Sequence, residues 1–205
     1  WMRNLRLGFN AALNQYTRQS GIPTDFNTTE LREYINRRND YKEQKHLYDF
    51  NDLVELAIIN DMHPPNTKVL ISDEIQDNSP LLFTLQELWE SKMERVYMGA
   101  DPYQAIFCFM GADPKLFINA KSDQAITLKQ SYRCSLAIHD ISRKLVSRFN
   151  TRYPDDDFTP TNLTGLVKHT PPSAIDWEGL KGRTFYLHRT NWLLSKAYRD
   201  LMREG

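Results

Sequence analysis

Apolar residues recur at every third or fourth position near the start of the chain, which predicts a helix over Met2–Arg18. The same spacing predicts helices over Thr29–Arg38 and Phe50–Ile59, and polar Asn and Thr residues before the former favour a helix N-terminus. A Gly-Ile-Pro turn and a charged stretch separate the three helices. We therefore expect residues 1–48 to form a helical segment.

Beyond residue 60 the pattern changes to short apolar runs that alternate with amphipathic stretches. Strands that alternate with helices are typical of an α/β domain with a parallel sheet. The runs predict strands, and the stretches predict helices, at Lys68–Ile71 (strand), Pro80–Met93 (helix), Arg95–Met98 (strand), Ala125–Leu128 (strand) and Ser135–Phe149 (helix).

Residues 150–180 interrupt this alternation, because they are rich in Pro, Thr and Asp. Such a composition indicates a linker or an irregular excursion between domains. A strand over Thr184–Leu187 and a helix over Trp192–Arg203 are predicted after it. The predicted domains are an α/β domain over 49–150, a linker over 151–180 and the start of a second domain over 181–205.

Composition and charge exclude several classes of protein. The 205 residues include 26 Lys and Arg against 26 Asp and Glu, so a nucleic-acid site would have to be local. Two cysteines and five scattered histidines argue against a disulfide framework and a zinc site. No apolar run reaches the length of a membrane span and no signal peptide opens the chain, so we expect a cytoplasmic protein without a membrane partner.

Candidate chemistry begins where the first predicted strand ends. The stretch "VLISDEIQD" places Asp73 and Glu74 directly after an apolar run. Ligands of parallel α/β sheets bind beyond the carboxyl ends of the strands, where one acid can hold Mg²⁺ and the next can orient or deprotonate a water. A solvated acidic turn is the simpler interpretation, and a Mg²⁺-dependent nuclease that also uses Asp77 is another.

The second predicted strand also ends in polar residues. "RVYMGADPYQAIFCFMGA" leads from this strand to Gln104, and then to Phe107 and Phe109. Core packing is the commoner fate of aromatic side chains, but the glycines at both ends of the stretch make a loop at least as plausible. In a third segment, "LKQSYRCS", Tyr132 and Arg133 come just after the third predicted strand, where an arginine taken alone is a surface charge.

Together these segments resemble the UvrD/Rep/PcrA family of superfamily 1 DNA helicases. Residues 73–77 resemble the family's DExQD motif II, residues 99–112 resemble motif III (close to GDxDQSIYxFRGA), and residues 128–135 resemble motif IV (typically LxxNYRS). Residues 49–53 are similar to the DFDDL segment, and residues 188–205 to YRTNxxSRxxExxLxxxG. The matches stand in the family's order, and residues 1–48 would belong to the helical insertion of the first domain.

The resemblance implies a fold and a nucleotide site. The fold would be a RecA-like parallel sheet flanked by helices, followed by the start of a second RecA-like domain. The cofactors would be ATP and Mg²⁺, with Asp73 coordinating the metal, Glu74 activating the attacking water and Gln104 sensing the γ-phosphate. Tyr132 would pack on the adenine, and Arg133 would contact the γ-phosphate.

The resemblance also implies a DNA site and an activity. Phe107 and Phe109 would stack on the bases of single-stranded DNA. The implied function is an ATP-dependent 3′-to-5′ DNA helicase or translocase that acts on single strands and duplex junctions, for example in DNA repair or replication. A non-catalytic remnant that binds DNA or a partner is the alternative.

This sequence departs from the family pattern in several places. Met110 stands where the family usually has arginine, and Tyr103 and Asn51 stand where it has aspartate. No GxxxxGK[ST] phosphate loop occurs in the 205 residues. We therefore expect an internal fragment of a larger helicase, without the phosphate loop and the C-terminal motifs, that does not hydrolyse ATP by itself.

Overall fold

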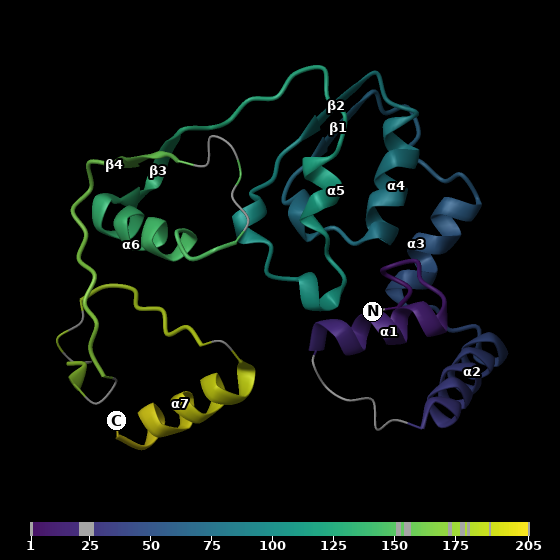
Figure 1. Ribbon diagram of the computed structural model, residues 1–205, viewed down its shortest axis with the longest axis horizontal. Coiled ribbons are helices and arrows are strands. Elements are labelled where there is room, and N and C mark those ends of the chain that lie inside the picture. The colour runs from purple at the N-terminus through teal and green to yellow at the C-terminus, as the bar shows by residue number, and fades with distance from the viewer. Residues whose placement is uncertain are drawn as a thin grey trace. The chain divides into compact units, whose positions relative to one another are not determined.

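The computed structural model describes residues 2–20, 27–150, 153, 157–171, 174–176, 179, 181–188 and 190–204. The chain divides into two compact units, Trp1–Ile126 and Thr127–Gly205. Both are mixed α/β, with short parallel strands and helices (Figure 1). The first unit thus ends before the boundary expected at 151–180, and the assignment of residue ranges to family domains stays a prediction.

The first unit holds most of the helices. Its elements are α1 (Phe9–Ser20), α2 (Thr28–Lys45), α3 (Phe50–Ile59), β1 (Val69–Ser72), η1 (Ile75–Asp77), α4 (Pro80–Glu90), β2 (Arg95–Met98), η2 (Pro102–Gln104), η3 (Cys108–Met110) and α5 (Pro114–Ile118), where η denotes a 3₁₀ turn. The boundaries predicted for α3 and β2 are confirmed.

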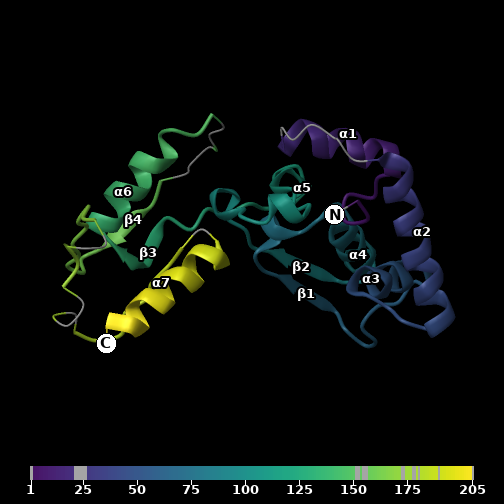
Figure 2. The same cartoon turned by 90° about the horizontal axis from the view of Figure 1, so that it is seen from below.

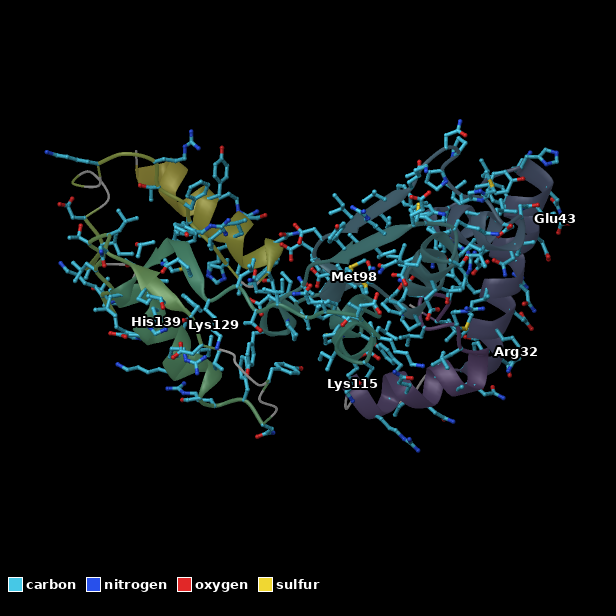
Figure 3. All side chains as sticks on the ribbon, turned by 90° about the horizontal axis from the view of Figure 1, so that it is seen from above. Arg32, Glu43, Met98, Lys115, Lys129 and His139 are labelled. Carbon is cyan, nitrogen blue, oxygen red and sulfur yellow. The ribbon has the colours of Figure 1, made fainter. Side chains whose placement is uncertain are left out.

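β1 and β2 form a parallel pair in which Val69 lies opposite Arg95 and Ser72 opposite Met98. Alternate residues point to opposite faces, so one face of the pair is half-buried and the other is exposed. Helix α4 packs on the half-buried face, where Nε2 of Gln86 lies 3.2 Å from the sulfur of Met98, and α5 lies on the same side (Figures 2 and 3). Because both strands run in one direction, their carboxyl ends meet at one edge.

The helix predicted over Met2–Arg18 begins only at Phe9, so the prediction is wrong for residues 2–8. Residues 2–7 form a turn instead, closed by a hydrogen bond from the backbone N–H of Leu7 to the carbonyl of Met2. Arg6 has φ of 53°, which no helix accommodates. Helix α2 extends to Lys45, well beyond the predicted end, because its second half is almost entirely polar and leaves no apolar spacing to read.

An ion-pair cluster fastens this N-terminal turn to α2 and α3. Asp49 caps α3 by accepting the N–H of Asp52, and it also accepts hydrogen bonds from Arg3, Arg38 and Lys42. Burial acts to raise the pKa of Asp49, but the hydrogen bonds from Lys42 and Arg38 outweigh it and hold that pKa well below its usual range. The ionised carboxylate is therefore stabilised in the folded state.

We expect this cluster to make stability depend on pH. Because the pKa of Asp49 is lowered on folding, its contribution is present above the unfolded pKa of about 4 and is lost as the pH falls below it. Asp49→Asn retains a good helix cap but no charge, so it should lower the free energy of unfolding by about 1–2 kcal/mol at pH 7. Urea denaturation at pH 7 and pH 3 measures both effects.

The control is Asp40→Asn on α2, where the exposed carboxylate forms no ion pair with the described residues. The difference in the free energy of unfolding between the wild type and Asp49→Asn should be smaller at pH 3 than at pH 7. Asp40→Asn should have the same free energy of unfolding as the wild type at both pH values. An Asp49→Asn protein that is as stable as the wild type at pH 7 would contradict the interpretation.

The second unit contains β3 (Gln130–Ser135), α6 (Leu136–Val146), β4 (Thr159–Thr161) and α7 (Asn191–Glu204). β3 pairs with β4 in parallel, and α6 packs against both strands (Figure 1). The segment expected to be a linker therefore supplies a strand, since Thr159–Thr161 lies within it.

Two strand predictions are wrong. Residues 125–128 form no strand, and the strand begins instead at Gln130, where the polar residues resemble a loop in sequence. The apolar side chains that suggested a strand, Ile126 and Leu128, are 75% and 86% exposed. Residues 184–187 are likewise not paired as a strand. Among the described residues, no helix is both long and apolar enough to cross a membrane.

Candidate nucleotide and DNA site

Two exposed carboxylates follow the end of β1. Asp73 and Glu74 come directly after Ser72, and the N–H of Glu74 donates to Oδ1 of Asp73 over 2.9 Å. Glu74 has a left-handed backbone with φ of 57°, which is uncommon for a residue with a side chain. Such conformations are found more often at functional sites than elsewhere, which fits a site at this strand end.

Gly99 brings the end of β2 against the same loop. Its N–H donates to the carbonyl of Ser72 over 2.8 Å, and its carbonyl accepts from the N–H of Ile75 over 3.2 Å. A Cβ at this position would lie 3.0 Å from Oδ1 of Asp73, which is closer than side chains normally pack. A larger residue at this position would therefore have to displace the Asp73 carboxylate.

A chain of hydrogen bonds joins Glu74 to Gln104. Nε2 of Gln76 donates to Oε2 of Glu74 over 2.5 Å, and Oε1 of Gln76 accepts the N–H of Asp101 over 3.1 Å. Nε2 of Gln104 in turn donates to Oδ2 of Asp101 over 2.7 Å. Gln76, at the middle of this connection, is only 1% exposed, whereas Glu74 and Gln104 at its two ends are exposed. Hydrogen bonds thus connect two of the predicted site residues, Glu74 and Gln104, which follow different strands.

The carboxylates fit the coordination chemistry of Mg²⁺. This ion prefers oxygen ligands, keeps several waters and is usually bound through one or two carboxylates together with substrate phosphates. Asp73 and Glu74 supply such oxygens on an exposed strand end. Nothing in the described part of the chain forms a group of three or more His, Cys, Asp or Glu residues that could hold a metal by itself.

Asp77 does not join the other two acids, which removes the basis for the nuclease interpretation. Its side chain lines a separate cavity of about 350 Å³, together with Phe107 and Asn4. Its Oδ1 is buried without a hydrogen-bond partner among the described residues. The three acids of the motif therefore face two different surroundings.

Phe107 and Phe109 lie on the loop around η3, and neither is part of the core. They are 41% and 73% exposed, and their ring centroids are 6.3 Å apart at an angle of 39° between the planes. This exposure favours a loop over the core-packing alternative, more strongly for Phe109 than for Phe107, which lines the cavity described above. Met110, which stands in place of the arginine expected from the resemblance, is also exposed and adds an apolar side chain to this loop.

Tyr132 and Arg133 lie within β3 of the second unit, and not after a strand as predicted. Both side chains are exposed, and the N–H of Arg133 donates to Oγ of Ser131 over 3.2 Å. Their proximity to Asp73 and Glu74 stays a prediction, because the two units are described independently.

The sequence had not singled out Gln76, Asp101 or Asn4 as site residues. The first two lie inside the motif segments, but their roles as bridges depend on the side-by-side placement of two loops that are 25 residues apart in the chain. Asn4 lies far from every motif in sequence, so no local pattern could have indicated it.

Comparison with known proteins gives a consistent family. Residues 9–125 match the family model described as the UvrD/REP helicase N-terminal domain. The chain is 31% identical over 128 residues to an ATP-dependent helicase/nuclease subunit of Latilactobacillus sakei, covering 58% of this chain and 14% of that protein. It is 25% identical over 134 residues to the ATP-dependent DNA helicase srs2 of Schizosaccharomyces pombe, covering 62% of this chain and 15% of that protein. The chain thus spans about one seventh of the length of these relatives.

Proposed function

Because the chain belongs to the UvrD/Rep helicase family, we propose that it is part of an ATP-dependent DNA helicase that moves 3′-to-5′ on single-stranded DNA. The observation that carries the proposal is the linked pair of strand ends, where Glu74 and Gln104 are joined through the buried Gln76 and the half-buried Asp101. Such a link suits a site in which the state of a nucleotide is passed to a neighbouring loop. The fold around it would be RecA-like, with junctions of single and double strands as further DNA partners.

The nucleotide would be held at the carboxyl ends of β1 and β2. Asp73 would bind Mg²⁺, which supplies charge neutralisation to the phosphate oxygens of ATP when bound. Glu74, next to it on the strained turn, would orient the attacking water and take up its proton. Gln104, held by Asp101, would contact the γ-phosphate and sense its loss.

Two exposed residues of β3, Tyr132 and Arg133, are proposed nucleotide contacts on the ground of the family resemblance. Tyr132 would pack on the adenine ring, and Arg133 would place its guanidinium on the γ-phosphate, where negative charge is spread over the oxygens during transfer. Both side chains are exposed on β3, as a residue that meets a ligand must be.

DNA would bind at the aromatic loop, defined as residues 107–111. Bases stack on aromatic side chains without much regard to sequence, and each stacked base contributes about 1–3 kcal/mol. Phe107 and Phe109 offer exposed rings that suit this role. With no phosphate loop among its 205 residues, the chain by itself would bind single-stranded DNA without hydrolysing ATP.

We expect Phe109→Ala to weaken binding of the 205-residue chain to a single-stranded oligonucleotide by at least about fivefold, because the substitution removes one stacking surface. Fluorescence anisotropy with mixed-sequence oligonucleotides measures the affinity. Tyr34→Ala on α2 is a matched control, since it removes an aromatic side chain that is 65% exposed and remote from the motif segments. Unchanged affinity with a lower melting temperature would assign Phe109 to packing instead.

A further inference from the structure

The turn at residues 2–7, here the N-terminal turn, lies against the aromatic loop although 106 residues separate the two contact points in sequence. Nδ2 of Asn4 donates to the carbonyl of Met110 over 2.9 Å. The carbonyl of Asn4 accepts the N–H of Leu81 over 3.0 Å, at the start of α4. Asn4 therefore joins the last residue of η3 to the N-terminus of a helix that packs on the sheet.

Gly111 makes the contact close. It has φ of 101°, a conformation that suits glycine, and a Cβ there would lie 3.1 Å from the Cβ of Asn4 and 3.5 Å from Leu5. Gly111 is buried, whereas Phe109 and Met110 immediately before it are exposed. The aromatic loop thus contacts the N-terminal turn at Met110 and Gly111, while the side chain of Phe109 is exposed.

The N-terminal turn is itself held firmly from both sides. Arg3 forms a two-point contact with Glu55, with Nε to Oε1 at 3.0 Å and Nη2 to Oε2 at 2.7 Å, and it also pairs with Asp49 and Asp52. Nη1 of Arg6 donates to Oγ1 of Thr84 on α4 over 2.6 Å. Asn4 lies between these two anchored arginines, so its amide is presented to the loop from a fixed base.

Other contacts hold the two ends of this loop. Ala112, directly after it, is buried, and the N–H of Asp113 donates to the carbonyl of Asn78 over 3.0 Å. Phe107 and Met110 line a cavity with residues of α3 and α4. The internal hydrogen bonds of the loop run from Met110 and Ala112 to the carbonyl of Phe107, and from Gly111 to the carbonyl of Cys108. These bonds set the local curvature of η3, but they do not fix where the loop stands on the unit. Of the side-chain hydrogen bonds among the described residues, the one from Asn4 is the bond that ties η3 to a distant segment.

We infer that Asn4 is a positioning residue for single-stranded DNA binding, acting through the carbonyl of Met110 to hold Phe107 and Phe109 in the orientation that stacks on bases. This inference rests on the proposed DNA-binding role of the loop and adds to it a residue outside the motif segments. A rigid stacking surface loses less conformational freedom on binding than a mobile one. Loss of the hydrogen bond from Asn4 to Met110 should therefore lower the affinity for bases.

The test compares two oligonucleotides of equal length, one of deoxythymidine and one of abasic sites, so that the ratio of their affinities isolates the contribution of the bases. In the 205-residue chain, Asn4→Leu keeps the side-chain size and removes the donor. It should lower the base-dependent ratio about three- to tenfold and leave binding of the abasic strand unchanged. The matched control is Asn10→Leu on α1, which should leave the ratio unchanged. Among the described residues, the amide oxygen of Asn10 accepts a hydrogen bond from exposed Arg32 and has no contact with the aromatic loop.

A mutant cycle with the paired substitutions Phe107→Ala and Phe109→Ala separates positioning from general damage. If Asn4 acts through the two aromatic rings, Asn4→Leu lowers the affinity for bases no further once both rings have been removed. Additive losses, or an equal loss for the abasic strand, overturn the inference. If Asn4→Leu fails to fold, Asn4→Ala, which preserves the backbone carbonyl bond to Leu81, is measured in the same cycle.

Failure of the inference and failure of the proposed function give different results. If the Phe109→Ala variant lowers the base-dependent ratio and the Asn4 variants do not, only the positioning role is wrong. If neither has an effect, the aromatic loop is not the DNA site, and the proposed function fails with it.

Discussion

Glu74→Gln in the complete helicase that contains this chain should lower ATP turnover by about 10²–10⁴-fold while nucleotide still binds. The carboxylate is proposed to take the proton of the attacking water, and an amide cannot do so. The amide oxygen can still accept the hydrogen bond that Nε2 of Gln76 now donates to Glu74 over 2.5 Å. The strained turn is therefore retained, and the loss falls on the chemical step.

Turnover is measured as steady-state phosphate release, and binding is measured separately with a fluorescent nucleotide. The control variant is Glu87→Gln, an exposed glutamate on α4 that makes the same chemical change away from the strand ends. Retained turnover in Glu74→Gln would return the acidic stretch to the status of a solvated turn. A parallel loss of binding would point to a metal-binding role for Glu74 instead.

Arg133→Lys should remove most of the DNA-stimulated hydrolysis, because arginine contacts of this type contribute about 10³–10⁵ to the rate of phosphoryl transfer. Lysine retains the positive charge but lacks the planar fork of donors that matches phosphate oxygens. The affinity for ATP should fall far less than the rate, since the charge on the γ-phosphate oxygens develops in the transition state.

Arg148→Lys is the matched control, because it makes the same substitution at an exposed position in the second unit. A rate for Arg133→Lys within a few-fold of the wild type would leave this arginine as a surface charge. A structure of the complete protein with Arg133 on the side opposite Asp73 would contradict the assignment independently of any rate.

The strand ends were predictable because their signal is local. An apolar run followed by "DE" and a second run followed by Gly and Gln place polar groups at the carboxyl ends of strands, and the parallel pairing of β1 with β2 brings those ends together. The exposure of Phe109 could also be predicted, since flanking glycines favour a loop. Local pattern was sufficient for these two features, although the apolar run at 125–128 shows that it can also predict a strand that does not form.

The contacts that hold the site together were not predictable from local pattern. Gln76 meets Asp101 only after two strands have paired, and Asn4 meets Met110 only after the N-terminal turn has docked. The turn itself was mistaken for helix, because apolar spacing reveals neither the positive φ of Arg6 nor the ion pairs that Arg3 forms with α3. The polar strand β3 was missed for a related reason, since a run such as "QSYRCS" shows no apolar alternation.

The most direct test of the central claim is steady-state phosphate release from Mg-ATP by the complete protein, with and without single-stranded DNA, beside the 205-residue chain in the same assay. If the chain carries the water-activating and sensing residues of a DNA-driven motor, the complete protein releases phosphate faster when DNA is added, and the chain alone releases almost none. Hydrolysis by the complete protein that DNA does not accelerate would contradict the claim, and so would turnover by the chain alone at the rate of the whole.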